Sequence, residues 1–249
     1  FRSPASTVAG SQMPALGLSD NQIDLLALYT LSLRRRTLPD VYLPKDRVRA
    51  MRFGEREFAK DGETIYTAVC SSCHAADGRG TRFPGLVPNP SIMSPEFLQL
   101  ASDDFLFQTI RNGRPGRPML PWGDRVNGFN DDELRSVIAY IRGLGGNVQA
   151  LPDPKPQIWA MGDANLGATL FASNCSGCHG KNAVGGDGPA LANKAFLSSV
   201  SDTFLVGTIT RGRSGTVMQG FGDPSPIRRA LTQAEVESIV VYIRSLGAK

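Results

Sequence analysis

The distribution of apolar residues predicts three helices that share one pattern. Apolar side chains recur at i, i+3, i+4 and i+7, as in Leu134–Ile141, and this spacing indicates an amphipathic helix. The three stretches are Asn21–Leu31, Asp132–Arg142 and Ala234–Arg244. Each follows a residue type that caps helix N-termini, and the last two stretches end near a glycine. The caps are Ser19, Asn130 and Thr232, and the glycines are Gly143 and Gly247. The chain therefore contains an internal repeat.

A second repeated pattern lies upstream of the last two helices. Residues 62–70 and 167–175 both read glycine, three residues, an aromatic, three residues, cysteine. A glycine and an aromatic four positions apart lie on one face of a helix. Each repeat is therefore predicted to begin with a helix as well as to end with one.

The strongest chemical signal is a pentapeptide that occurs twice, as C-S-S-C-H and C-S-G-C-H, and uses every cysteine and histidine of the chain. C-x-x-C-H is the attachment signature of c-type haem, in which the thiols bond to the porphyrin and the histidine binds iron. A C-x-x-C can also be a redox dithiol or part of a zinc site, but a structural zinc needs four ligands and each pentapeptide offers three. The residues are Cys70, Cys73, His74, Cys175, Cys178 and His179.

On these motifs, each half of the chain resembles a class I cytochrome c domain, and the whole resembles a dihaem cytochrome c. The resemblance implies an all-α fold, with two tandem class I cytochrome c domains that carry covalent haem c, preceded by a helical arm. In this family the C-terminal helix crosses the N-terminal helix beside the haem. Gly62 and Gly167 would allow that close crossing, and their aromatic neighbours would pack on Tyr140 and Tyr242.

The expected domain organisation follows from these repeats and from the linkers. A chain of 249 residues is long for one domain and natural for two of about 90–100 residues. Prolines in the second linker are predicted to stiffen it, and Trp159 to pin it to a domain surface. The predicted segments are 1–33 (the end of a cytochrome c-like domain, with a helix at about 20–33), 34–60 (basic linker), 61–147 (domain 1), 148–160 (proline-rich linker) and 161–249 (domain 2).

The resemblance also predicts the axial ligands. Pro84 and Pro189 each stand ten residues after the motif histidine; in the family a proline there packs on the histidine, and a nearby carbonyl accepts its Nδ1–H. Since no further histidine is present, methionine is the expected distal ligand. Met218 is the only methionine after the second motif. In domain 1 we favour Met119, whose loop aligns with that of Met218, over Met93, which is expected to pack in a loop or to line the haem edge.

Glycine-rich loops before these methionines carry arginines that are predicted to contact the haem propionates, with solvation as the alternative. Trp122 is a further candidate donor to a propionate. The arginines are Arg111, Arg114, Arg211 and Arg213.

Residues 1–33 resemble the closing third of another cytochrome c domain, in which Met13 stands six residues before the cap Ser19. No C-x-x-C-H precedes Met13. Either this segment is a helix that packs on domain 1, or it completes a haem domain whose first half lies on another polypeptide. Met13 is accordingly either a ligand of a third haem or an ordinary methionine.

Positive charge is concentrated in the first 60 residues, which hold ten Lys and Arg against six Asp and Glu. No known nucleic-acid motif accompanies this charge, so nucleic acid is not an expected partner. The arm is expected to be solvated, or to dock on an acidic protein or on an anionic membrane surface. Because c-type haem is attached after export in the family, a removed leader and a periplasmic location are expected.

The predicted function is electron transfer through two haems with His/Met ligation. The chain would be a subunit of a respiratory or dehydrogenase complex, with redox proteins as partners, and not itself an enzyme. Full ligation of both irons leaves no open position for small-molecule chemistry. The alternatives are a haem enzyme of the peroxidase or thiosulfate-oxidising type, and a structural spacer.

Overall fold

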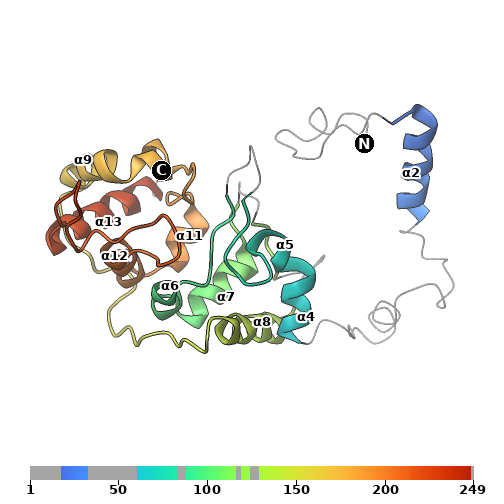
Figure 1. Cartoon of the computed structure of the whole chain (residues 1–249), viewed down its shortest axis with the longest axis horizontal. Coiled ribbons are helices and arrows are strands. Elements are labelled where there is room, and N and C mark those ends of the chain that lie inside the picture. The colour runs from blue at the N-terminus through green and yellow to red at the C-terminus, as the bar shows by residue number, and fades with distance from the viewer. Residues whose placement is uncertain (1–17, 33–60, 83–87, 116–118, 124–128, 248–249) are drawn as a thin grey trace. The chain divides into compact units, whose positions relative to one another are not determined.

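The computed structural model describes residues 18–32, 61–82, 88–115, 119–123 and 129–247; Met13, the basic linker 34–60 and Pro84 lie outside them. The chain divides into two compact units, Phe1–Glu57 and Phe58–Lys249, each described by itself. In the first unit the described element is helix α2 (Asp20–Ser32), drawn in blue in Figure 1. Ser19 N–H donates to Gln22 Oε1 at 2.9 Å and Gln22 N–H donates to Ser19 Oγ at 3.4 Å, which confirms Ser19 as the N-cap.

The described residues of the second unit form helices and no strand, so the predicted all-α class is confirmed. The second half repeats the first, because α9 corresponds to α4 with η2, and α11, α12 and α13 correspond to α6, α7 and α8. The helices are α4 (Gly62–Ile65), the π-helix η2 (Tyr66–Cys70), α5 (Ser71–His74), α6 (Pro95–Leu100), α7 (Asp103–Asn112), α8 (Asp131–Leu144), α9 (Ala164–Asn174), α10 (Ser176–His179), the 3₁₀-helix η3 (Lys181–Ala183), α11 (Lys194–Ser199), α12 (Asp202–Arg211) and α13 (Gln233–Gly247). None of the described helices is both long enough and apolar enough to cross a membrane.

The first and last helices of each half cross at a glycine. A Cβ on Gly62 would lie 2.0 Å from Ser136 O of α8, and a Cβ on Gly167 would lie 2.0 Å from Ser238 O of α13. One turn along, the ring of Tyr66 lies 5.3 Å from that of Tyr140. Phe171 and Tyr242 make the equivalent contact at 5.5 Å. The predicted glycine-plus-aromatic crossing is confirmed in both halves.

A buried arginine ties the last helix of each half to the helix pair before it. Arg142 of α8 donates to the carbonyl oxygens of Leu98 and Ala101 and to the carboxylate of Asp103. The carbonyls at a helix C-terminus lack partners within the helix, so the guanidinium supplies donors that the end of α6 needs. The second half repeats this arrangement with Arg244, Leu197, Val200 and Asp202.

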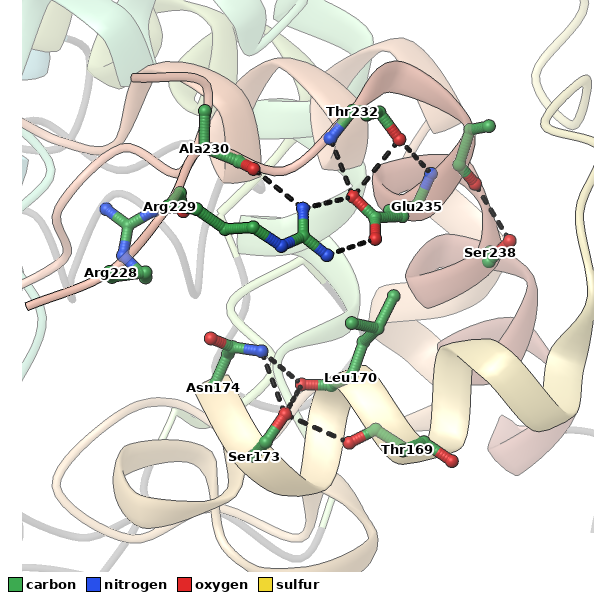
Figure 2. Close-up of polar contacts among 11 residues, drawn as sticks. Thr169, Leu170, Ser173, Asn174, Arg228, Arg229, Ala230, Thr232, Glu235 and Ser238 are labelled. Atoms are coloured by element: carbon green, nitrogen blue, oxygen red, sulfur yellow. Dashed lines mark hydrogen bonds and ion pairs between the residues drawn. The ribbon is translucent and has the colours of Figure 1, made fainter. Parts of the chain in front are cut away.

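Side chains also define where the helices around the second pentapeptide begin and end, as Figure 2 shows. At the start of α13, Thr232 N–H donates to Glu235 Oε2 at 2.9 Å and Glu235 N–H donates to Thr232 Oγ1 at 3.3 Å, a capping box that confirms Thr232 as the cap. At the end of α9, Asn174 Nδ2 donates to Leu170 O at 2.9 Å, directly before Cys175.

The linker between the two halves is held by hydrogen bonds along its length. Leu151 N–H donates to Gln99 O of the first half at 2.7 Å. At the other end, the N–H groups of Trp159 and Ala160 donate to Asp202 Oδ2 at 2.6 and 2.7 Å. The indole Nε1–H of Trp159 donates to Thr203 Oγ1 at 2.9 Å, so the expectation that this side chain pins the linker is confirmed.

Candidate functional site

Each C-x-x-C-H pentapeptide lies at the end of the first helix of its half. Cys70 and Cys175 are half-buried, whereas Cys73 and Cys178 are exposed, and all four are free. Burial is the main reason that the pKa of the two half-buried thiols is raised to about 11. The short helices α5 and α10 then turn sharply after the histidine, where Ala75 has a φ of 62°. Each pentapeptide therefore keeps its two thiols and its histidine within one short helical segment that ends at the histidine.

The histidines are oriented by backbone carbonyls. His74 Nδ1 lies 3.0 Å from Pro90 O, and His179 Nδ1 lies 2.8 Å from Pro189 O. A proton on Nδ1 that is donated to the carbonyl leaves Nε2 with a lone pair for a metal. Burial lowers the pKa of both imidazoles, which favours the neutral, ligating form.

Pro90 was missed by the sequence analysis. The expected proline, Pro84, lies outside the described residues, whereas the carbonyl beside His74 belongs to Pro90, 16 positions after it. The signal was present, since Pro90 and Pro189 are 99 residues apart, as are Met119 and Met218. The first half has six extra residues between its histidine and this proline, so a count of ten from the histidine does not lead to Pro90, and the packing of Pro84 on His74 stays a prediction. In the second half the carbonyl is that of Pro189 itself.

The predicted distal methionines occupy equivalent loops. Arg114 N–H donates to Met119 O, and Arg213 N–H donates to Met218 O, both at 2.8 Å. Both loops begin with a glycine at positive φ, Gly113 at 61° and Gly212 at 72°. They also end alike, because Trp122 N–H donates to Ile110 O of α7 and Phe221 N–H donates to Ile209 O of α12. Met93 instead lies against Gly78, in the loop that follows the first pentapeptide.

The four candidate arginines separate into an outer and an inner pair. Arg111 is paired with the Asp131 carboxylate at 2.8 Å and is well exposed, and Arg211 is also exposed. Arg114 and Arg213 are half-buried, with Arg114 Nη1 and Arg213 Nε inaccessible to solvent, and desolvation lowers the pKa of each side chain to about 10. Trp122 stacks on Phe129, with ring centroids 6.1 Å apart.

The buried polar atoms allow a test of whether these residues fit a haem. Arg114 Nη1 and Arg213 Nε are buried and have no hydrogen-bond partner among the described residues, and the hydroxyls of Thr208 and Thr210 share this state. Buried donors of this kind normally have partners. A propionate-bearing macrocycle supplies acceptors for them. Together with the thiols and the imidazole Nε2, the residues of each half therefore fit a covalently bound haem.

Comparisons with known proteins match both halves of the second unit. The family model "Cytochrome C oxidase, cbb3-type, subunit III" matches residues 57–141 and 162–243. Over 197 residues the chain is 31% identical to the cbb3-type cytochrome c oxidase subunit FixP of Bradyrhizobium sp. (strain ORS 278), covering 75% of this chain and 60% of that protein. Identity is 30% to FixP of Bradyrhizobium diazoefficiens, covering 75% and 60%, and 27% to subunit CcoP of Azospirillum sp. (strain B510), covering 75% and 61%. The chain thus spans about three fifths of the length of these relatives.

Proposed function

Because the chain belongs to the family of cbb3-type cytochrome c oxidase subunit III, whose two cytochrome c domains bind two covalent c-type haems, we propose that it transfers electrons within a cbb3-type oxidase. The observation that carries the proposal is the duplication of one complete site. Each half contains a C-x-x-C-H, a histidine Nδ1 on a proline carbonyl, and a methionine in a glycine-led loop.

Each residue type has a distinct role in this proposal. The two cysteines of each pentapeptide would hold the porphyrin through thioether bonds, and the histidine Nε2 would bind the iron. Pro90 and Pro189 hold the imidazoles in the ligating tautomer. When bound, each haem supplies a one-electron couple.

Met119 and Met218 are proposed as the distal ligands. Each lies in the loop between the two last helices of its half, and the loops share their backbone hydrogen bonds. Thioether ligation by these residues would raise the reduction potential relative to imidazole and would leave no open position on the iron. Closed irons suit an electron carrier, so we assign this chain the role of carrier within an enzyme complex.

The partners proposed are the other subunits of the oxidase, as the names of the relatives suggest. Because c-type haem is attached after export in this family, we propose that the cytochrome domains lie in the periplasm. The basic segment 34–60 is proposed to contact an acidic subunit surface or anionic lipid headgroups. Met13 stays a candidate ligand of a further haem.

The proposal is tested by ligand variants of the holoprotein. We expect two haems per chain by mass, and a thioether-to-iron charge-transfer band in the oxidised spectrum. Met119→Ala and Met218→Ala should each remove about half of this band and open one ferrous iron to carbon monoxide. Met93→Leu is the matched control and should change neither property.

Three outcomes would contradict the proposal. Prompt binding of carbon monoxide by the unmodified protein would indicate an open iron and favour an enzyme of the peroxidase or thiosulfate-oxidising type. A band that survives both alanine variants would show that other groups are the ligands. A chain without haem would contradict the whole assignment.

A further inference from the structure

The two halves of the second unit meet through phenylalanines in equivalent positions. Phe97 and Phe196 are one equivalent pair, and Phe105 and Phe204 are another, each 99 residues apart. The ring of Phe97 lies 5.9 Å from that of Phe204, and the ring of Phe105 lies 6.1 Å from that of Phe196. These two contacts are the same contact with the halves exchanged. The interface is therefore self-complementary, as in a two-fold symmetric dimer.

The centre of this interface contains the two rings that face each other directly. Phe105 and Phe204 have centroids 4.9 Å apart with planes tilted by 41°. All four phenylalanines are buried. Hydrogen bonds border this contact, because Asn193 Nδ2 donates to Pro115 O at 2.9 Å and Ser214 N–H donates to Glu96 at 3.0 Å. Packed aromatic rings with a polar border fix the two halves in one arrangement.

The inner arginines cross this interface. The guanidinium carbon of Arg114 lies 5.0 Å from the centroid of Phe196 in the other half, and 5.9 Å from Phe105 in its own half. Arg213 repeats this pattern at 4.6 Å from Phe97 and 5.7 Å from Phe204. Each arginine thus lies closer to a ring of the opposite half. Desolvated cation–π contacts of this kind are among the stronger ones.

The same arginines are chemically tied to their own sites. Each donates its backbone N–H to the carbonyl of the proposed ligand, Met119 or Met218. Arg114 Nη2 donates to Thr109 Oγ1 at 3.0 Å, while Arg114 Nη1 and Arg213 Nε have no partner among the described residues. A guanidinium that is largely removed from water is stabilised by an anionic group beside it. Within the proposed function, haem propionates provide it.

We propose that Arg114 and Arg213 are crossed positioning residues, each paired with the haem of its own half and held in place by a phenylalanine of the other half. This inference rests on the proposed function. It makes the reduction potential of each haem depend on packing contributed by the opposite domain. A buried positive charge beside a haem stabilises the reduced state, because reduction removes one positive charge from the iron site. Loosening the arginine admits water, screens the charge and lowers the potential.

The test replaces, one at a time, the phenylalanine of one half that contacts the arginine of the other half. Phe196→Leu changes only the second half, yet it should lower the potential of the haem attached at Cys70 and Cys73 more than that of the haem on its own half. Phe97→Leu should lower the potential of the haem attached at Cys175 and Cys178 more than that of the haem on its own half. The potentials of the two haems are measured by spectroelectrochemical titration. Each potential is assigned to one haem by repeating the titration in Met119→Ala and in Met218→Ala, which each remove the charge-transfer band of one haem. Leucine stays apolar and fills most of the space of the ring, so we expect the fold to be retained.

Two further variants make the result decisive. Arg114→Lys keeps the charge but loses the planar stack, and it should reproduce the effect of Phe196→Leu on the first haem. Arg135→Gln is the matched control, because Arg135 stacks on Phe107 at 4.9 Å within one half, and it should shift neither haem. If Phe196→Leu shifts only the haem of its own half, the crossed role is wrong. Loss of haem or of the charge-transfer band in the unmodified protein would instead contradict the proposed function.

Discussion

At the residue scale, one carboxylate joins the linker to the second domain. Asp202 has a side chain only 1% exposed and accepts hydrogen bonds from Arg244 and from the N–H groups of Trp159 and Ala160. Its counterpart Asp103 pairs with Arg142 but is 66% exposed. The two residues make the same ion pair in different surroundings, so they allow a matched comparison.

We expect Asp202→Ala to lower the free energy of unfolding by about 3–5 kcal/mol, because it removes a buried carboxylate that accepts from the Arg244 guanidinium and from two linker N–H groups at a place that water does not reach. Asp103→Ala should cost about 1 kcal/mol, since water replaces much of what the exposed carboxylate provides. Denaturant unfolding of the two variants, followed by far-ultraviolet circular dichroism, measures both values. Equal losses would contradict the difference in burial.

The cap of α13 predicts a pH effect. The hydrogen bond from Arg229 holds the pKa of Glu235 at about 2, well below its usual range, and the N–H of Thr232 adds to the shift. A lowered folded-state pKa means that this stabilisation is complete above the unfolded pKa of about 4.3 and is lost as the pH falls toward 2. Glu235→Gln should therefore flatten the stability curve between about pH 4.5 and pH 2. Thermal melts across this range test it, and an unchanged slope would contradict the ion pair.

At the element scale, helix crossing depends on a single missing Cβ. Gly167→Ala would place a carbon 2.0 Å from Ser238 O, and the backbone of α13 must move to accept it. We expect a loss of about 1–3 kcal/mol. Gly143→Ala is the matched control, because its nearest neighbour would lie at 3.8 Å and alanine favours a helix by about 0.8 kcal/mol or more over glycine. Chemical denaturation that found both variants equally destabilised would contradict this reasoning.

The helices were the most predictable elements, for a physical reason. Periodicity and capping residues act within a few positions, so the helix of Asp131–Leu144 and its cap Asn130 were evident in the sequence. The carbonyl that orients His74 was not, because the loop that brings Pro90 to it contains six more residues than its counterpart. The contacts of Arg114 and Arg213 with the opposite half also could not be predicted, since they depend on how two domains dock.

At the scale of the whole molecule, we expect the packed interface to set the separation of the two haem sites. The sequence suggested that Pro152, Pro154 and Pro156 stiffen the linker and so limit the separation. In the structure the linker is hydrogen-bonded to both halves, at Gln99 and at Asp202, and the phenylalanine rings contact directly. The prolines are therefore not needed to hold the two domains of the second unit together.

Replacing all three prolines by glycine tests this conclusion. We expect the haem-to-haem spacing, measured from magnetic dipolar coupling of the oxidised holoprotein, to stay unchanged, because the ring contacts and linker hydrogen bonds remain. The double variant Phe105→Ala with Phe204→Ala removes the central ring pair. It should broaden the distribution of haem-to-haem spacings, although the prolines are intact. The opposite pattern, a broad distribution in the glycine variant and a narrow one in the alanine variant, would assign the spacing to the linker. It would also remove the rigid interface on which the crossed arginines depend.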